Sequence, residues 1–191
     1  MSEQNNMDAT FGQLKQQWMD TKDQAKVDEI VTQLKVLAEK GHGPANALLG
    51  KIFDSPRNKK RDEIAALDYL EQAVKLKVPE AFSDLGLAYQ NRNELEKAAA
   101  LFKEGAELGD ASSMGSLGDL LIAGEGVAKD SINGIRWLKK AADAGDNYAK
   151  KVYAFQLIIG EAITADPAKA IEILDSEFKE QREGAVAYNI A

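Results

Sequence analysis

Apolar residues recur at helical spacing along most of this chain, and residues 130–145 show the pattern most clearly. Ile135, Leu138 and Ala142 fall at i, i+3 and i+7, which predicts one apolar stripe along a helix. Asp130 precedes the stripe, and its carboxylate can accept hydrogen bonds from the unpaired N–H groups of a first helical turn. Gly145 follows the stripe and is expected to end the helix in a left-handed C-cap, where a residue without a β-carbon costs little.

The same pattern returns at fixed offsets, which identifies a repeat. A large residue precedes a small one by 12 positions in four pairs, Tyr69 and Ala81, Leu101 and Ser113, Trp137 and Ala149, and Ile173 and Ala185. Small residues recur in the following helices at Gly50, Gly86, Gly118 and Ala154, so successive copies lie 36, 32 and 36 residues apart. A mid-helix glycine costs about 1 kcal/mol against alanine, and close helix–helix approach is the expected reason. Each copy is a helix pair that must stack on its neighbours to bury an apolar face.

The repeat divides the chain into three parts. Residues 42–191 are expected to form the array, with about four helix pairs and a partial fifth that restarts at Gly184 with Ala185 in register. Residues 9–41 are expected to form a degenerate helical unit, and the polar residues 1–8 a flexible N-terminus. The partial fifth copy leaves two alternatives: it covers the last groove, or the natural chain continues further.

Composition narrows the class of protein. The formal net charge of −7 argues against a binder of nucleic acid or of anionic membranes, because both surfaces require a basic patch. The short basic run Lys59-Lys60-Arg61 is interpreted as a solvated turn. The chain has no cysteine, which excludes disulfides, thiolate metal sites and cysteine nucleophiles. No basic-then-apolar signal segment and no apolar run near 20 residues occurs, so a cytoplasmic location is expected.

Candidate chemistry is sparse, so we expect no enzyme, no metal site and no cofactor. His42 is the single histidine and lies in a Gly-His-Gly turn without a second ligand for zinc or a nucleophile to activate. Gly124-x-Gly126 lacks the preceding strand and the Lys-Ser/Thr pair of a phosphate loop, and a connection between antiparallel helices explains it better.

Several short sequence motifs of the third copy resemble the Sel-one-like repeat (SLR) family of tetratricopeptide-like helical repeats. They are Leu117-Gly118, Gly124-Glu125-Gly126-Val127, Asp130, and the run from Trp137 to Gly145. The resemblance covers roughly residues 38–191 and implies an all-α, right-handed α-α superhelix (a solenoid) with first helices on its concave side. It also implies a non-catalytic adaptor, and the family includes bacterial immunity-type and regulatory proteins. Gly134 stands where the family usually has alanine, and Ala154 where it usually has glycine.

The concave face of the first helices, which lines the groove of the array, is the candidate partner-binding surface. A turn of 100° per residue from the recurring small position places eight residues there: Leu48, Lys51, Asp84, Leu87, Ser116, Asp119, Val152 and Phe155. Leu87, Val152 and Phe155 are apolar where solvent is expected, so they can anchor a helix or peptide. The alternative is that neighbouring repeats bury them. We therefore expect a non-enzymatic protein-protein interaction module, with self-association into a homodimer through the C-terminal end as the alternative.

Overall fold

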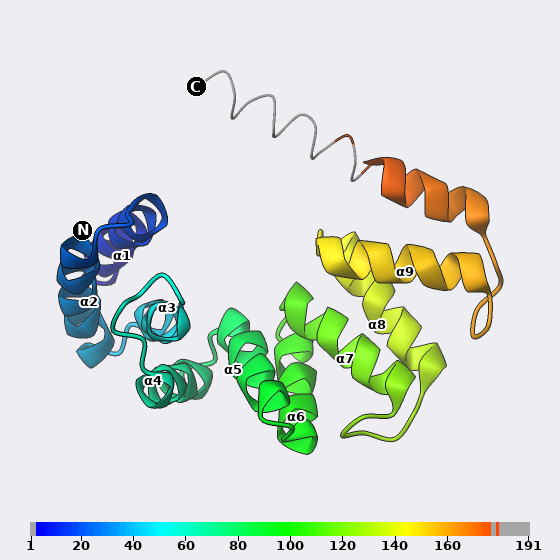
Figure 1. Cartoon of the computed structure of the whole chain (residues 1–191), viewed down its shortest axis with the longest axis horizontal. Coiled ribbons are helices and arrows are strands. Elements are labelled where there is room, and N and C mark those ends of the chain that lie inside the picture. The colour runs from blue at the N-terminus through cyan, green and yellow to red at the C-terminus, as the bar shows by residue number, and fades with distance from the viewer. Residues whose placement is uncertain (1–2, 177–178, 180–191) are drawn as a thin grey trace. The chain divides into compact units, whose positions relative to one another are not determined.

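The structure, a computed structural model, describes residues 3–176 and 179 of the chain, and this part contains helices and no strand. The helices of Figure 1 are α1 (Glu3–Asp20), α2 (Gln24–Glu39), α3 (Gly43–Asp54), α4 (Glu63–Lys75), α5 (Pro79–Asn91), α6 (Leu95–Glu107), α7 (Ala111–Ala123), α8 (Ser131–Asp143) and α9 (Asn147–Ile159). A further helical stretch follows at residues 167–176. The predicted all-α fold of repeated helix pairs is confirmed, while the handedness of the superhelix stays a prediction.

The caps that the sequence predicted for α8 are present at both ends of this helix. Asp130 caps α8 by accepting a hydrogen bond from the Asn133 N–H at 3.1 Å. Gly145 has a φ of +95°, so the predicted left-handed turn after α8 is confirmed. Lys77 occupies the corresponding position after α4, 36 residues beyond Gly41, and adopts a φ of +57° without being glycine. The repeat thus imposes the same turn on a residue that is poorly suited to it.

The chain divides into two compact units, residues 1–88 and 89–191. In the first unit, α1, α2 and α3 share one core that includes Leu14, Leu34 and Leu49, each almost fully buried. The degenerate N-terminal helices therefore pack on the first clear repeat. The ring of Tyr69, on α4, stacks on that of Phe53 with centroids 5.7 Å apart.

Residues 3–8, which the sequence analysis assigned to a flexible N-terminus, lie in α1, because this helix begins at Glu3. Tertiary contacts hold this segment, and they were invisible in its polar composition. The carboxylate of Asp8 lies 3.0 Å from Nε2 of His42, and Glu3 lies 3.3 Å from Nζ of Lys40.

The second unit is built around close contact between α7 and α8. A β-carbon at Gly118 would lie 2.8 Å from the Gly134 carbonyl oxygen, and one at Gly134 would lie 2.6 Å from the Gly118 carbonyl oxygen. The two backbones thus approach more closely than any side chain would allow, which confirms the predicted role of the recurring mid-helix glycine. Phe102 of α6 and Leu138 of α8 are fully buried in the adjoining cores.

Candidate protein-interaction surfaces

In the first unit, the predicted partner-binding residues have three different environments. Lys51 of α3 forms an ion pair with Asp84 of α5 at 3.1 Å. Leu87 is 45% exposed. Leu48 is only 7% exposed and belongs to the core shared by α1, α2 and α3, so its assignment to an open concave face was wrong. The cause is the N-terminal pair of helices, because α2 covers this side of α3.

In the second unit, the predicted face is partly a contact between neighbouring first helices. Asp119 of α7 accepts a hydrogen bond from the hydroxyl of Tyr148 on α9 at 2.7 Å. Ser116 and Val152 are half-buried, whereas Phe155 is 58% exposed. Asp119 and Lys51, which occupy corresponding positions, both contact the next first helix. These two predicted residues therefore take part in stacking within the array.

The Asp119–Tyr148 hydrogen bond changes the acidity of both groups. Burial raises the pKa of the Asp119 carboxyl above its ordinary value, although the bond from Tyr148 counteracts this. The same bond, together with burial, raises the pKa of Tyr148 to about 12. The pair is therefore a neutral phenol donating to a carboxylate at neutral pH, a structural link and not an acid–base pair poised for catalysis.

A different hollow, which we call the second-helix groove, is lined by residues of α6, α7, α8 and the loop between α7 and α8. Its volume is about 620 Å³, and it is open to solvent. Its floor and walls are largely apolar and its rim is charged; the lining residues are Glu96, Ala99, Ala100, Lys103, Glu107, Leu117, Leu121, Gly126, Val127, Ala128, Lys129, Asp130, Asn133 and Trp137. The half-buried Trp137 packs against the core below. The sequence analysis assigned Trp137 to packing and missed that it also lines an open groove.

The loop between α7 and α8 contributes residues 126–130 to the lining of this groove. Gly126 has a φ of +67°, and a β-carbon there would lie 2.3 Å from the carbonyl oxygen of Leu95 at the start of α6. Gly124, with a φ of +79°, ends α7 in a left-handed cap. These two glycines bring the loop against α6 and place Val127 in the groove wall. The Gly124-x-Gly126-Val127 motif therefore indicates the second-helix groove in the sequence, although the sequence analysis interpreted it only as a connection between helices.

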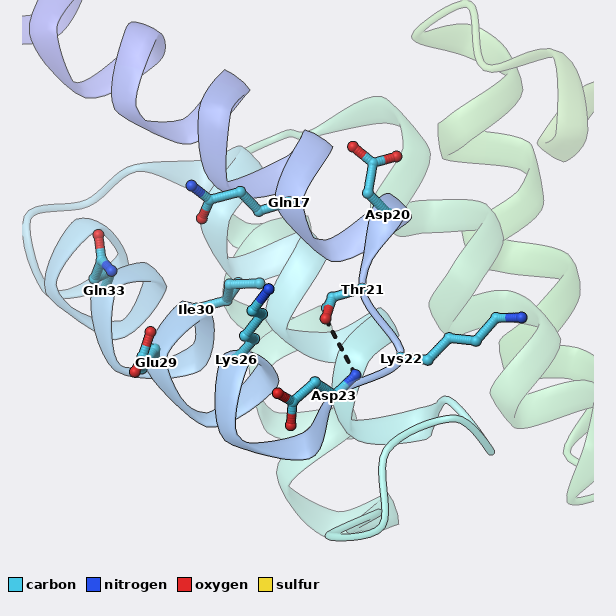
Figure 2. A pocket seen from close by; sticks show the side chains of 9 residues that line it. All are labelled: Gln17, Asp20, Thr21, Lys22, Asp23, Lys26, Glu29, Ile30 and Gln33. Carbon is cyan, nitrogen blue, oxygen red and sulfur yellow. Dashed lines mark hydrogen bonds between the residues drawn. The ribbon is translucent and has the colours of Figure 1, made fainter. Parts of the chain in front are cut away.

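A second hollow, of about 550 Å³, lies between α1 and α2 (Figure 2). Its lining is polar, with Lys22 and Lys26 among the acidic side chains of Asp20, Asp23 and Glu29. In Figure 2 the Lys22 side chain points away from the others, so these charges do not converge on one point. The hollow thus lacks both an apolar floor and a set of convergent polar groups.

His42 has a structural role. Its side chain is almost fully buried, and Nδ1 accepts a hydrogen bond from the Ala45 N–H at 3.1 Å, which caps α3. Because Nδ1 accepts, the neutral ring carries its proton on Nε2 and donates it to Asp8. Phe11 packs on the ring at a centroid distance of 5.0 Å. Within residues 3–176, no group of three or more His, Asp or Glu side chains is arranged to hold a metal ion.

No helix in the part of the chain that the structure describes is both long and apolar enough to cross a membrane. This finding concerns the helices alone.

Comparison with known proteins identifies three Sel1 repeats in this chain, at residues 43–78, 84–110 and 111–146. Similar solved structures include a Sel1 repeat protein from Oxalobacter formigenes, with 25% identity and a TM-score of 0.71 over 77% of this chain and 61% of that one. Another is c5321, a protective antigen with an SLR fold from uropathogenic Escherichia coli, with 22% identity and a TM-score of 0.69 over 89% of this chain and 41% of that one. A third is the immunity protein Pa5087 from Pseudomonas aeruginosa, with 24% identity and a TM-score of 0.67 over 91% of this chain and 64% of that one.

This chain therefore spans less than two thirds of the length of each of these three structures. A search of the curated proteins finds no match.

Proposed function

This chain belongs to the Sel1 repeat family, and we propose that it is a non-enzymatic module that binds a peptide segment of a protein partner in the second-helix groove. Sel1 repeats are in general protein-interaction modules, and the proposal assigns that role to a particular surface. It replaces the concave first-helix face as the main site, because Leu48 is buried there and Lys51 and Asp119 contact neighbouring helices.

One observation carries the proposal: an open apolar groove with a charged rim in a folded helical unit. Leu117 and Leu121 form part of its floor, and Trp137 offers an aromatic surface of the kind that anchors partners. A solvated apolar hollow of this size gains free energy when an apolar side chain of a partner displaces its water.

Charge favours a partner with basic residues around its apolar anchors. The rim carries the acidic residues Glu96, Glu107 and Asp130 against two lysines, Lys103 and Lys129. The whole chain has a formal net charge of −7, so its field accelerates the approach of a basic partner.

The test is affinity purification with mass spectrometry from the native cells, followed by binding measurements with the purified partner. Ala100→Arg places a long cation in the groove at an exposed helical position, and Ala25→Arg makes the same change at an exposed position on α2. We expect Ala100→Arg to weaken binding at least tenfold and Ala25→Arg to leave it unchanged, with equal far-UV circular dichroism for both. Equal affinity of Ala100→Arg and wild type for every partner removes the groove from the proposal.

The first-helix face remains a proposal that the same partner can test. Leu87 and Phe155 are its two exposed apolar residues among the eight that the sequence indicated. If Leu87→Asp combined with Phe155→Asp abolishes binding while Ala100→Arg does not, the partner lies on the first helices.

The finer role that we propose is a cytoplasmic bacterial immunity or regulatory adaptor that neutralises a cognate effector. The similarity to the immunity protein Pa5087, at 24% identity, concerns the fold, so this step rests on analogy. It is tested by producing this chain together with a toxin encoded beside it: rescue of growth by wild type and loss of rescue by Ala100→Arg support the role. A neighbour without toxicity, or rescue that is independent of this chain, contradicts it.

A further inference from the structure

Another hollow in the second unit repeats the second-helix groove one copy later. It has a volume of about 380 Å³ and is lined by residues of α8, of α9 and of the stretch 163–169, and we call it the α8–α9 groove. Each residue that lines it stands 36 residues beyond a residue that lines the second-helix groove, as Tyr153 does beyond Leu117 and Leu157 beyond Leu121. Because 36 residues is a spacing between copies, the two hollows are the same feature of successive copies.

The backbone that shapes the two grooves is also the same. In the second-helix groove, the Asp130 N–H donates to the carbonyl oxygen of Leu121 at 2.8 Å and so returns the loop to α7. In the α8–α9 groove, the Asp166 N–H donates to the carbonyl oxygen of Leu157 at 2.9 Å and returns the chain to α9. Each aspartate carboxylate also accepts a hydrogen bond from the N–H three residues later. The α8–α9 groove is therefore built by the contacts that build the first one.

The floor of the α8–α9 groove is apolar and fixed. Ile135, Tyr153 and Leu157 line the groove and belong to the core that α8 and α9 share, and their exposed fractions are 3%, 7% and 4%. Side chains held in a core keep their positions whether or not a ligand is present. An apolar side chain of a partner can thus pack on this floor without ordering it first.

The rim differs in charge from that of the second-helix groove. Arg136 stands where α6 has Ala100, and Lys169 stands where α8 has Asn133, so two cations replace two uncharged residues. Both cations are exposed. The second-helix groove has three carboxylates and two lysines in its lining, whereas the α8–α9 groove has three cations and one carboxylate.

The contacts within the chain leave this positive charge largely available. Among the three cations of the lining, Lys139 forms an ion pair with Asp143. The Arg136 guanidinium donates to the amide oxygen of Asn133 at 3.2 Å, which is a neutral acceptor. The carboxylate of the lining, that of Asp166, accepts a backbone N–H as a helix cap. Charge complementarity therefore favours a carboxylate on whatever occupies the α8–α9 groove.

The helix α8 separates the two grooves and contributes to both. Asn133 and Trp137 line the second-helix groove, whereas Ile135, Arg136 and Lys139 line the α8–α9 groove. At 100° per residue these two sets lie on different sides of α8. A peptide segment that crosses α8 therefore passes from one groove into the other.

We propose that the α8–α9 groove is a second docking site for the partner segment, and that it takes an apolar side chain flanked by acidic residues. The second-helix groove takes an apolar side chain flanked by basic residues. The inference rests on the proposed function, since it extends the same segment into the next copy. Two joined contacts strengthen binding beyond either one, and the opposite rims select the direction of the segment, because the reverse direction places like charges together.

Two capped tripeptides test the α8–α9 groove without the natural partner. One has leucine between two glutamates and the other has leucine between two lysines. Each is titrated at millimolar concentrations into the full ¹⁵N-labelled chain, and nuclear magnetic resonance follows the backbone amides. We expect the glutamate tripeptide to shift Thr164, Ala165 and Lys169 saturably, with an affinity at least fivefold above that of the lysine tripeptide.

Charge reversal is the matched variant. Arg136→Glu with Lys169→Glu should invert the preference between the tripeptides, whereas Lys15→Glu with Lys26→Glu makes the same change in net charge at exposed positions of α1 and α2 and should leave it intact. The amide spectra also show that each variant is folded. Equal affinity of the two tripeptides for wild type, a preference that survives reversal, or no shift at Thr164 with either tripeptide overturns the proposal.

The purified partner separates this inference from the proposed function. We expect Arg136→Glu with Lys169→Glu to weaken its binding at least fivefold, and the α1–α2 control pair to leave binding unchanged. If Ala100→Arg weakens binding but the charge reversal does not, the second-helix groove stands and the second docking site is wrong. If the reversal weakens binding but Ala100→Arg does not, the α8–α9 groove binds alone and the proposed function fails at its own groove.

Discussion

Replacing Gly134 by alanine tests whether close backbone contact holds α7 and α8 together. The new β-carbon would lie 2.6 Å from the Gly118 carbonyl oxygen and 2.7 Å from Cγ1 of Ile122. The first neighbour is backbone and cannot rotate away, so the helices have to separate. The resemblance to the Sel-one-like repeat family implies alanine at this position and so favours the substitution, whereas the geometry opposes it.

Two opposing effects set the magnitude. Alanine stabilises a helix interior by about 1 kcal/mol relative to glycine. Overpacking costs roughly 1–3 kcal/mol, and the upper end applies where a backbone atom is the obstacle. We therefore expect Gly134→Ala to lower the free energy of unfolding by about 2 kcal/mol. Gly12→Ala is the matched control, since Gly12 lies inside α1 with nothing within 4 Å of the added carbon. It should raise the free energy of unfolding by about 1 kcal/mol.

Urea unfolding followed by far-UV circular dichroism measures both changes. The two tryptophans, Trp18 and Trp137, lie in different units, so fluorescence in Trp18→Phe and Trp137→Phe backgrounds assigns each transition to its unit. Each background serves as the reference for its own glycine variant. A higher midpoint for Gly134→Ala, similar to that expected for Gly12→Ala, would refute the close-contact reasoning.

Three other predictions each follow from one local feature: a left-handed backbone angle, a close backbone contact and a raised pKa. Lys77→Gly should raise the free energy of unfolding by about 1 kcal/mol in urea melts, since a left-handed φ of +57° disfavours a residue with a β-carbon; a loss of stability contradicts this. Gly126→Ala should cost more than about 2 kcal/mol, because its carbon meets the Leu95 carbonyl at 2.3 Å, and no measurable loss would contradict the loop geometry. Tyr148 should titrate near pH 12 by nuclear magnetic resonance of labelled tyrosine rings, and Asp119→Asn should lower that pKa. Because the folded-state pKa is raised above the ordinary value of 10, the stabilisation is complete below pH 10 and is lost as the pH rises toward 12; an unchanged pKa in Asp119→Asn contradicts the assignment.

The fold could be predicted from the sequence because the repeat is fixed by local requirements. Gly118 has to be small for α7 to meet α8, and Gly145 has to reach a positive φ after α8. Requirements of this kind recur at a fixed period, so one sequence alone displays them several times.

The candidate surface was less predictable because it depends on how one helix pair lies on the next. Leu48 is buried by α2, a helix of a degenerate unit whose packing the register did not specify. Tyr148 was not identified, since its bond to Asp119 joins two first helices across the repeat offset. The second-helix groove is likewise formed by α6 and α8 of different copies, and helical periodicity within one copy contains no information about it.

The N-terminal helices behave as a repeat even though their sequence has lost the pattern. In the third copy, the loop after α7 packs Gly126 against Leu95 at the start of α6, the second helix of the preceding copy. In the first copy, the loop after α3 does the same by hydrogen bonds: the Gln24 amide, at the start of α2, donates to Asn58 at 3.1 Å and accepts from the Lys59 N–H at 2.8 Å.

Thus α2 stands to α3 and α4 as α6 stands to α7 and α8. The contact is kept while its chemistry changes from glycine against a carbonyl to a buried amide pair, with Asn58 only 3% exposed. Buried amides are costly when unpaired, and Asn58 is fully satisfied: besides the bond from Gln24, it donates to the Ile52 carbonyl oxygen at 3.2 Å and accepts from the Lys60 N–H at 3.0 Å. In both copies, the loop after the first helix contacts the start of the preceding second helix. We infer that this contact between successive copies forms even in a copy whose loop lacks the glycines of the motif.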